Sequence, residues 1–279
     1  MLAAPKKFKL VDSHVHVWKR DPKFPYAPGT RDPGEDRTPE MLLESMRANG
    51  VEKTVIIQVL YYMFDNSYAR FVVNRYPQHF VAVCRVDPRS PGAPDDLSKL
   101  IKEDKFQGVR ISPNGTPPGE WFSDESLMVP LWKRCQQLKT PMTVLMPIEK
   151  APVAQKWIEK FPDLTVVIDH MADCPVDRPQ ELEKLLALAQ YPKVFVKVSH
   201  SWHVSKQSYP WMDAQEQIKR IYDKFGPKRL MWGTDWPMCE PKTTYASTLT
   251  QLRDDTKFLT DADKEWILGK TAEQVWKFS

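Results

Sequence analysis

The sequence predicts an α/β fold, a (β/α)8 TIM barrel formed by a single domain over residues 1–279. Short apolar runs alternate with amphipathic stretches along the chain, and this alternation requires parallel strands joined by crossover helices. The units number about eight, which closes a barrel rather than leaving an open sheet. The length of 279 residues suits one barrel, which typically takes about 250 residues. No GxGxxG turn follows the first strand, so a dinucleotide-binding fold is not indicated.

The first predicted strand, residues 10–18, reads LVDSHVHVW. Successive side chains on a strand point to opposite faces, so His14 and His16 share one face while Val15 and Val17 pack on the other. The seven later runs are short, apolar and rich in β-branched residues, as expected of strands that are covered on both faces. They are predicted at residues 53–59, 80–86, 108–111, 141–146, 164–170, 194–199 and 229–235.

The first predicted helix, residues 41–48, has recognisable ends. Thr38 supplies a hydroxyl cap, Pro39 suits the first helical position, and the helix stops at Asn49 and Gly50. The loop before it, residues 21–39, is long enough to be functional. Further helices are predicted at residues 66–76, 94–105, 123–139, 151–161, 180–190 and 213–225, and two more, at 245–258 and 261–278, close the chain.

Composition excludes several classes of partner. Forty Lys and Arg against 36 Asp and Glu give a net charge of +4 without any long charged block, which does not favour nucleic acid or an anionic membrane surface. Residues 1–9 have too short an apolar region for a signal peptide, and no window approaches a membrane span. We therefore expect a soluble cytoplasmic protein with a small-molecule substrate, and leave homo-oligomerisation open. The widely spaced cysteines are expected to be reduced, small apolar side chains: Cys84, Cys135, Cys174 and Cys239.

In a barrel of this type, chemistry gathers at the carboxyl ends of the strands. Polar residues at predicted strand ends should therefore face one another across the barrel mouth. Burying such groups without partners costs roughly a few kcal/mol each, so a purely structural protein has little reason to collect them. The set comprises His14, His16, Gln58, Arg85, Arg110, His170, Lys197, Ser199 and Asp235.

The segments VDSHVHVW, VIIQV, GVRI, TVVIDHMA and LMWGTDWP resemble the amidohydrolase-2 family of metal-dependent TIM-barrel hydrolases. The resemblance runs from the first strand to the last helix and is closest to the branch of lactonases that act on sugar lactones and pyrone-dicarboxylates. It implies that His14 and His16 are metal ligands or substrate polarisers and that His170 is a ligand or a transition-state donor. It also implies that Asp235 is the base that activates water.

The chain departs from the family pattern at the fifth strand. Many mononuclear members carry another metal-binding histidine there, whereas this chain has VLMP at residues 144–147. The lysine that some binuclear relatives carboxylate has no clear counterpart, so a two-metal site is disfavoured. Whether His200 or His203 compensates stays open.

Two mechanisms remain compatible with these residues. One divalent ion, with Zn²⁺ the first choice and Mn²⁺ an alternative, would be held by His14, His16 and Asp235. Without a metal, as in some lactonases of the branch, His14, His16 and His170 would donate hydrogen bonds to the developing oxyanion. Asp235 acts as the base in both.

Arg110 is the best candidate for a substrate anchor, because a guanidinium can hold a carboxylate through two parallel hydrogen bonds. An internal ion pair with Asp87 is an equally favoured alternative. Lys197 and Arg85 could likewise bind substrate or form an internal ion pair, and for both of them the ion pair is favoured. Gln58 is a further candidate for substrate binding.

Tyr61 and Trp202 are candidates for an aromatic wall that contacts substrate. A cluster that only seals the barrel mouth is the commoner explanation for such residues. Asn66 and Asn114 are expected to be a helix cap or turn formers. The other members of the expected aromatic cluster are Trp18, Tyr62, Met63, Phe64 and Trp236.

The leading hypothesis is a hydrolase that opens a small cyclic ester. A narrower form of this hypothesis adds a carboxylate to the ester. The alternative is a metal-dependent decarboxylase of the same superfamily, which the missing fifth-strand histidine disfavours. A barrel that only binds ligand is disfavoured by the presence of His14, His16, His170 and Asp235 together.

Overall fold

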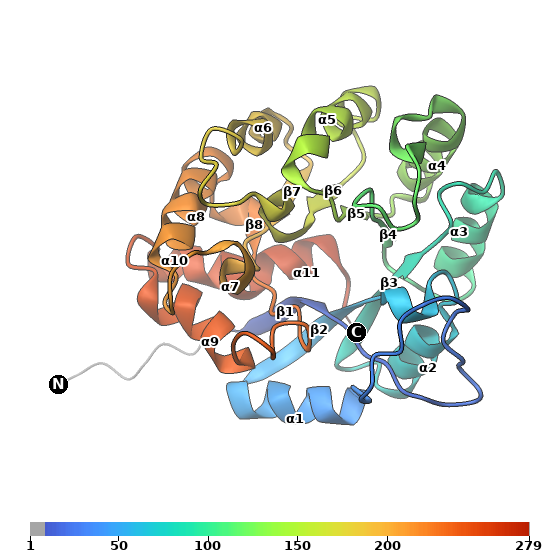
Figure 1. Cartoon of the computed structure of the whole chain (residues 1–279), viewed down its shortest axis with the longest axis horizontal. Coiled ribbons are helices and arrows are strands. Elements are labelled where there is room, and N and C mark those ends of the chain that lie inside the picture. Colours follow the sequence, from blue (N-terminus) through green and yellow to red (C-terminus); the bar gives the residue numbers. More distant parts are fainter. Residues whose placement is uncertain (1–8, 279) are drawn as a thin grey trace.

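The computed structural model describes residues 9–278, and it confirms the (β/α)8 TIM barrel (Figure 1). Eight parallel strands follow one another in chain order around the sheet, each paired with the next. The strands are β1 (Leu10–Val15), β2 (Val51–Ile57), β3 (Phe80–Arg85), β4 (Val109–Ile111), β5 (Met142–Val144), β6 (Val166–Ile168), β7 (Val194–Lys197) and β8 (Leu230–Met231).

The chain after β8 returns to β1 and completes the ring. The amide of Asp235 donates to the carbonyl of His14 at 2.9 Å, and the amide of His16 donates to the carbonyl of Trp236 at 2.7 Å. Gly233 permits this approach, because a Cβ at this position would lie 2.9 Å from the Cβ of His14. Closure therefore places the first strand directly beside the last.

Helices surround the strands as an outer layer (Figure 1). They are α1 (Pro39–Asn49), α2 (Ser67–Arg75), α3 (Ala93–Lys102), α4 (Glu125–Leu138), α5 (Ala151–Lys160), α6 (Glu183–Leu186), α7 (Ser201–Val204), α8 (Met212–Phe225), α9 (Tyr245–Thr250), α10 (Asp261–Glu265) and α11 (Thr271–Val275). Short 3-10 segments η1 (Leu60–Tyr62), η2 (Trp121–Ser123), η3 (Ile148–Lys150), η4 (Asp169–Asp173), η5 (Ala187–Gln190) and η6 (Pro227–Arg229) connect them.

The predicted elements are present, but their ends differ. The strands predicted at residues 10–18, 164–170 and 229–235 stop at Val15, Ile168 and Met231, where their parallel pairing with a neighbouring strand ends. Helix α7 was not predicted. The two closing helices are interrupted by π-helical turns η7 (Gln251–Asp255) and η8 (Trp266–Lys270).

The predicted ends of α1 are confirmed. Thr38 accepts a hydrogen bond from the amide of Met41, and Gly50 adopts a left-handed conformation with φ of 69°. The expected cap at Asn66 is wrong in its detail: the residue precedes α2, but its side chain bonds the backbone N–H and C=O of Arg85.

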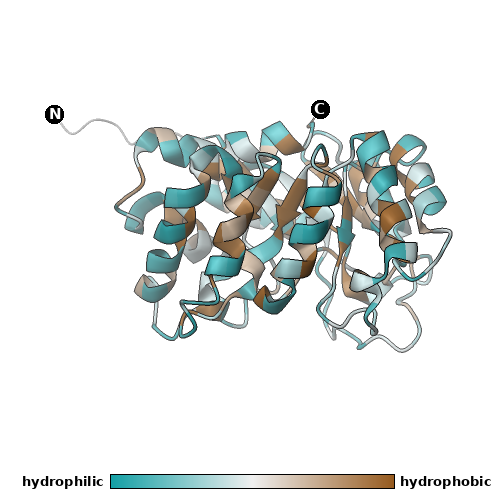
Figure 2. Cartoon of the chain, turned by 90° about the horizontal axis from the view of Figure 1, so that it is seen from above, coloured by the Kyte–Doolittle hydropathy of each residue, from teal (hydrophilic) through white to brown (hydrophobic). Residues whose placement is uncertain are grey.

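Two hydrophobic clusters hold the barrel together. One fills the barrel interior with side chains such as Val55, Val83 and Phe195, and Trp276 packs against it from the C-terminal segment. The other lies between the strands and the helices, whose outer faces are hydrophilic (Figure 2). All four cysteines are buried and free, as expected.

Within residues 9–278, no helix has both the length and the apolar character needed to cross a bilayer. The expectation that the chain lacks a signal peptide depends on residues 1–9, of which residues 1–8 lie outside the described residues.

Candidate active site

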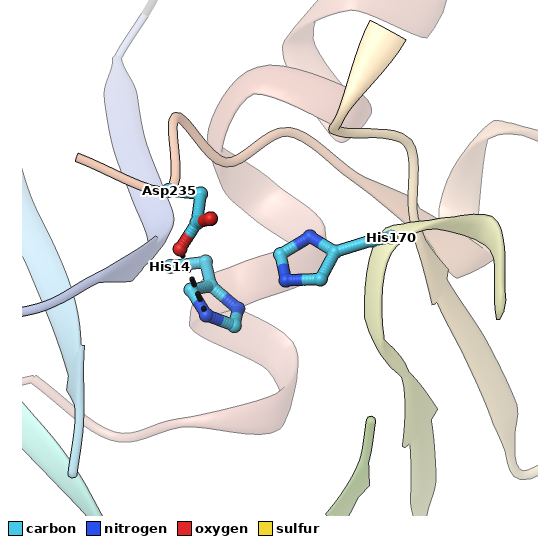
Figure 3. A group of neighbouring side chains, drawn as sticks. All are labelled: His14, His170 and Asp235. Carbon is cyan, nitrogen blue, oxygen red and sulfur yellow. Dashed lines mark ion pairs between the residues drawn. The ribbon is translucent and has the colours of Figure 1, made fainter. Parts of the chain in front are cut away.

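Four polar residues that are far apart in the sequence meet at the carboxyl ends of the strands. His14 belongs to β1, and His16 follows its last residue. His170 lies in η4 directly after β6, and Asp235 follows β8. Figure 3 shows His14, His170 and Asp235 directed toward one shared space. The predicted convergence is confirmed for these four residues, whereas their catalytic roles stay predictions.

His14, His16 and Asp235 form a tight triangle of potential ligand atoms. Nε2 of His14 lies 3.3 Å from Nε2 of His16 and 3.5 Å from Oδ1 of Asp235. Nε2 of His16 lies 3.2 Å from the same oxygen. Ligands bound tetrahedrally to zinc at about 2.0–2.2 Å are roughly 3.3–3.6 Å apart. The triangle therefore has the spacing of three ligands around one small cation.

His170 lies beside this triangle. One ligand atom each from His14, His170 and Asp235 lies within 4.8 Å of the others. Nδ1 of His170 is 2.8 Å from Oγ of Ser199, so its Nε2 remains available to the site. The predicted ligand set named His16 instead of His170, and Nε2 of His16 lies 3.2 Å from Oδ1 of Asp235.

The hydrogen bonds of the two first-strand histidines determine which ring nitrogens are free. Nδ1 of His16 donates to the carbonyl of Ile57 at 2.7 Å, which leaves a lone pair on its Nε2. Nδ1 of His14 lies 3.0 Å from Nζ of Lys197 and 3.3 Å from Oδ1 of Asp169. His14 can therefore carry its hydrogen on either nitrogen, depending on which neighbour it bonds.

Below the site lies a buried charge cluster centred on Asp169. Its carboxylate pairs with Lys197 and Arg110, each at 3.0 Å. Burial favours the neutral acid, but the charges of Lys197 and Arg110 outweigh it and hold the pKa of Asp169 well below its usual range. Burial lowers the pKa of Lys197, and Asp169 opposes that effect.

Three of these side chains have strongly shifted pKa values. Burial, reinforced by the charge of Lys197, lowers the pKa of His14 well below its usual range. Burial and the neighbouring His200 do the same to the pKa of His170. Burial works against ionisation of Asp235, yet His16 and His200 hold its pKa well below the usual range. His14 and His170 are thus neutral imidazoles beside the ionised carboxylate of Asp235.

His200 joins the site, which the sequence had left open. Its Nε2 lies 2.7 Å from Oδ2 of Asp235, and its Nδ1 lies 2.9 Å from Oδ1 of Asp173. Burial alone would lower the pKa of this histidine, but the two carboxylates raise it to about 9. His203 is exposed and does not line the pocket.

These side chains open into a cavity of about 280 Å³. Its polar wall includes Tyr61, Arg110 and Asn114 beside His16, His170 and Asp235. Its apolar wall is formed by Val59, Leu60, Leu145 and Met238. The cavity therefore suits a small molecule with one charged end and one apolar face.

Comparison with known sequences decides the family. The amidohydrolase profile matches residues 11–278, nearly the whole chain. This chain belongs to the amidohydrolase family. As an amidohydrolase it is a hydrolase of that superfamily, as the resemblance implied.

Curated relatives of this amidohydrolase include the L-fucono-1,5-lactonase of Burkholderia ambifaria, which is 28% identical over 235 residues, covering 82% of this chain and 80% of that protein. The 4-sulfomuconolactone hydrolase of Hydrogenophaga intermedia is 26% identical over 235 residues, covering 81% and 74%. A solved amidohydrolase of Burkholderia multivorans with bound zinc shares the fold, with a TM-score of 0.81 and 19% identity over 97% of this chain and 100% of that one.

Two of the predicted substrate contacts of this amidohydrolase lie on the cavity wall, namely Arg110 and Tyr61. The ion pair expected between Arg110 and Asp87 is wrong: Arg110 bonds Asp169, and Asp87 pairs with Arg89.

Three other predicted contacts do not reach the wall. Lys197 is fully buried and pairs with Asp169, so the ion-pair alternative holds for it. Gln58 is buried and donates to the carbonyl of Asp65 at 2.5 Å. Trp202 lies beside the ring of His200, 4.8 Å between centroids, rather than on the wall.

The ion pair that was favoured for Arg85 is wrong. No ion pair involves it among residues 9–278; instead its Nη2 donates to the carbonyl of Thr116 at 3.2 Å. Its Nε and Nη1 are buried without hydrogen-bond partners. Burial, together with the nearby charge of Arg110, lowers the pKa of Arg85 to about 9.

Four residues that line the cavity have a positive φ: His170 with 51°, Asp173 with 45°, His200 with 67° and Asp235 with 57°. Non-glycine residues rarely adopt this conformation, and strain of this kind concentrates at functional sites. The sequence could not distinguish His200 from His203, because both residues lie just past the seventh predicted strand.

Proposed function

We propose that this amidohydrolase hydrolyses a small lactone that carries a carboxylate. The observation that carries the proposal is the triangle of His14, His16 and Asp235, with 3.2–3.5 Å between ligand atoms. Two of its members, His16 and Asp235, line a small cavity. Two curated relatives with 26% and 28% identity are named for the opening of lactones, which supports this reaction class.

Asp235 is suited to activate water. Its Oδ1 is buried and accepts no hydrogen bond from the described residues. As the water oxygen attacks the lactone carbonyl carbon, Oδ1 accepts a proton and the carbonyl oxygen becomes an oxyanion. The ring C–O bond then breaks, and the departing oxygen takes the proton back from Asp235. The product is the open hydroxy acid, with one water consumed.

The residues present fit a divalent cation. His14, His16 and Asp235 offer two nitrogens and one oxygen at the spacing that zinc prefers, and Oδ1 of Asp235 is buried without a hydrogen bond from the described residues. Oδ1 of Asp169, which pairs with Lys197, lies 3.3 Å from Nδ1 of His14 and can accept its hydrogen. We propose Zn²⁺ as this ion. A bound divalent ion would polarise the carbonyl and lower the pKa of water.

The same residues also support catalysis without a metal. If Nδ1 of His14 accepts from Lys197, its Nε2 carries the hydrogen and points at the site. Together with Nε2–H of His170, it can then donate to the oxyanion. The choice between the two mechanisms depends on which nitrogen of His14 holds the proton.

The position of Arg110 is the reason for proposing that the lactone carries a carboxylate. Asp169 fixes its Nε edge at 3.0 Å, while the residue also lines the cavity. A guanidinium held in this way presents its remaining N–H groups in one plane, which is the geometry that a carboxylate accepts.

The test is a panel of five- and six-membered lactones, with and without a carboxylate, assayed by acid release on protein purified without chelator. We expect carboxylated lactones to be opened to hydroxy acids, identified by NMR, and bound metal to be counted by mass spectrometry. If correctly folded protein releases acid from none of them, the proposal is wrong. Release of CO₂ from an aromatic acid would instead identify a decarboxylase.

A further inference from the structure

His200 bridges two carboxylates from different parts of the barrel. Its ring lies between Asp235, which follows β8, and Asp173, the last residue of η4. The two nitrogen–oxygen distances are 2.7 Å and 2.9 Å, so both edges of the imidazole are engaged. The side chain is only 11% exposed.

One face of the ring is covered as well. The ring of His170 stacks on it with 3.5 Å between centroids and an angle of 1° between the planes. The backbone of His200 is left-handed, with φ of 67° and ψ of 17°. A histidine in a conformation that favours glycine indicates that its side chain, rather than the backbone, is required at this position.

We propose that His200 is a positioning residue that anchors Oδ2 of Asp235 and thereby keeps Oδ1 directed at His14 and His16. This inference rests on the proposed function, because it assigns the orientation of the proposed base. A free carboxylate turns about its terminal bond, and only one orientation places Oδ1 3.2 Å from Nε2 of His16. Anchoring one oxygen to a ring held on its edges and one face removes that freedom.

Asp173 acts through His200. No hydrogen bond or ion pair is found between Asp173 and Asp235 among the described residues, whereas each lies within 3 Å of one nitrogen of the same ring. Removing either Asp173 or His200 should therefore disturb the same orientation, and their effects should not add.

The main test is His200→Gly, because glycine accepts the left-handed backbone and leaves a hole of imidazole shape. We expect kcat for the lactone to fall about 10–100-fold, as for other residues that orient a reacting group, with KM changed less than about twofold. Added imidazole should restore kcat with saturation, since it can occupy the hole between the two carboxylates. His200→Gln, which can donate to Asp235 without bridging to Asp173, should retain more activity than His200→Gly.

Control variants distinguish a lost orientation of Asp235 from a general disturbance of the structure. Imidazole should not restore Asp235→Asn, which lacks the base. Added imidazole should also leave His203→Gln unchanged, because that variant removes an imidazole from α7, the short helix directly after His200, and His203 does not line the cavity. The double variant of His200→Gly with Asp173→Asn should be no slower than His200→Gly alone.

Crystal structures of His200→Gly with and without imidazole give a readout that does not depend on turnover. We expect the carboxylate of Asp235 to adopt more than one orientation without imidazole and a single one with it. An unmoved carboxylate, or wild-type kcat in His200→Gly, overturns the inference while lactone hydrolysis by the wild type stands. If the wild type opens no lactone, the proposed function fails and the crystal structures still decide the role of His200.

Discussion

Asp235 combines burial with a retained negative charge. Burial alone would raise the pKa of this carboxyl, but His16 and His200 hold it well below its usual range. The group is thus ionised across the neutral range, and its Oδ1 accepts no hydrogen bond from the part of the chain that the structure describes. An asparagine at position 235 would keep the shape of the side chain, but its amide could not accept the proton from water.

We therefore predict that Asp235→Asn lowers kcat for lactone hydrolysis by about 10²–10⁴-fold, the usual contribution of a general base. The melting temperature should change by only a few degrees, because the substitution is isosteric. Steady-state kinetics and thermal unfolding check this prediction. Near-wild-type turnover would remove the proposed mechanism.

Arg110 allows a test of the substrate's charge. Arg110→Lys can keep an ion pair with Asp169 but loses the planar fork that fits a carboxylate. We expect KM to rise about 10–100-fold for carboxylated lactones, corresponding to the loss of a charged hydrogen bond. Uncharged lactones of the same ring size are the control, and an equal effect on both would contradict a carboxylate anchor.

At the scale of elements, the contact between β1 and the chain after β8 positions the site. A Cβ on Gly233 would lie 2.9 Å from the Cβ and 3.2 Å from the amide nitrogen of His14. The strand would have to shift, which separates His14 from Asp235.

We predict that Gly233→Ala lowers both kcat and stability, the latter by about 1–3 kcal/mol as for other overpacked positions. Gly92→Ala is the matched control, because its Cβ would meet only Oγ of Ser90 at 3.4 Å. Denaturant unfolding and lactone kinetics measure both variants. Wild-type behaviour of Gly233→Ala would show that β1 and β8 tolerate a wider spacing.

The segment η4 joins the strands through Asp169. Its carboxylate contacts Lys197 on β7, Arg110 on β4 and His14 on β1. Because its folded-state pKa lies well below that of an unfolded aspartate, the unfolded chain binds a proton at pH values where the folded chain does not. The stability from this group is complete above about pH 4 and is lost as the pH falls toward the folded-state pKa.

We accordingly expect Asp169→Asn to lower the free energy of unfolding by about 3–5 kcal/mol at pH 7, because Lys197 and Arg110 stay buried without their carboxylate. The difference between variant and wild type should shrink as the pH falls below about 4. Urea unfolding between pH 3 and pH 7 provides the comparison, and a difference independent of pH would contradict this account.

For the whole molecule, the cation site predicts a ligand effect on stability. A metal that binds only the folded barrel raises the melting temperature by mass action. We expect added zinc to raise it, a chelator to reverse the rise, and His16→Asn to abolish both responses. The absence of any shift in the wild type would favour catalysis without a metal.

The barrel itself could be predicted because its signal is local. Alternating strands and helices, the cap at Thr38 and the histidine pair in the first strand each depend on neighbours in the chain. The boundaries were harder to predict. A parallel strand ends where its partner strand ends, so the stop of β6 at Ile168 depends on other strands.

The pairing of charges could not be predicted. An ion pair between Arg110 and Asp87 was one of two equally favoured expectations, whereas the structure pairs Arg110 with Asp169, which is 59 residues away. His200 was ambiguous for the same reason, because its two carboxylate partners come from other strands. A sequence shows which charges exist but not which of them meet.

The amino-acid sequence alone determined the fold class, the family resemblance and the principal site residues His14, His16, His170 and Asp235, because periodicity and residue type carry that information. Only the tertiary structure decided which of the remaining polar groups face the cavity and which are buried partners of one another. The reason is physical: ring closure sets distances between residues from different strands, and the resulting burial and charge pairing depend on all of those strands at once.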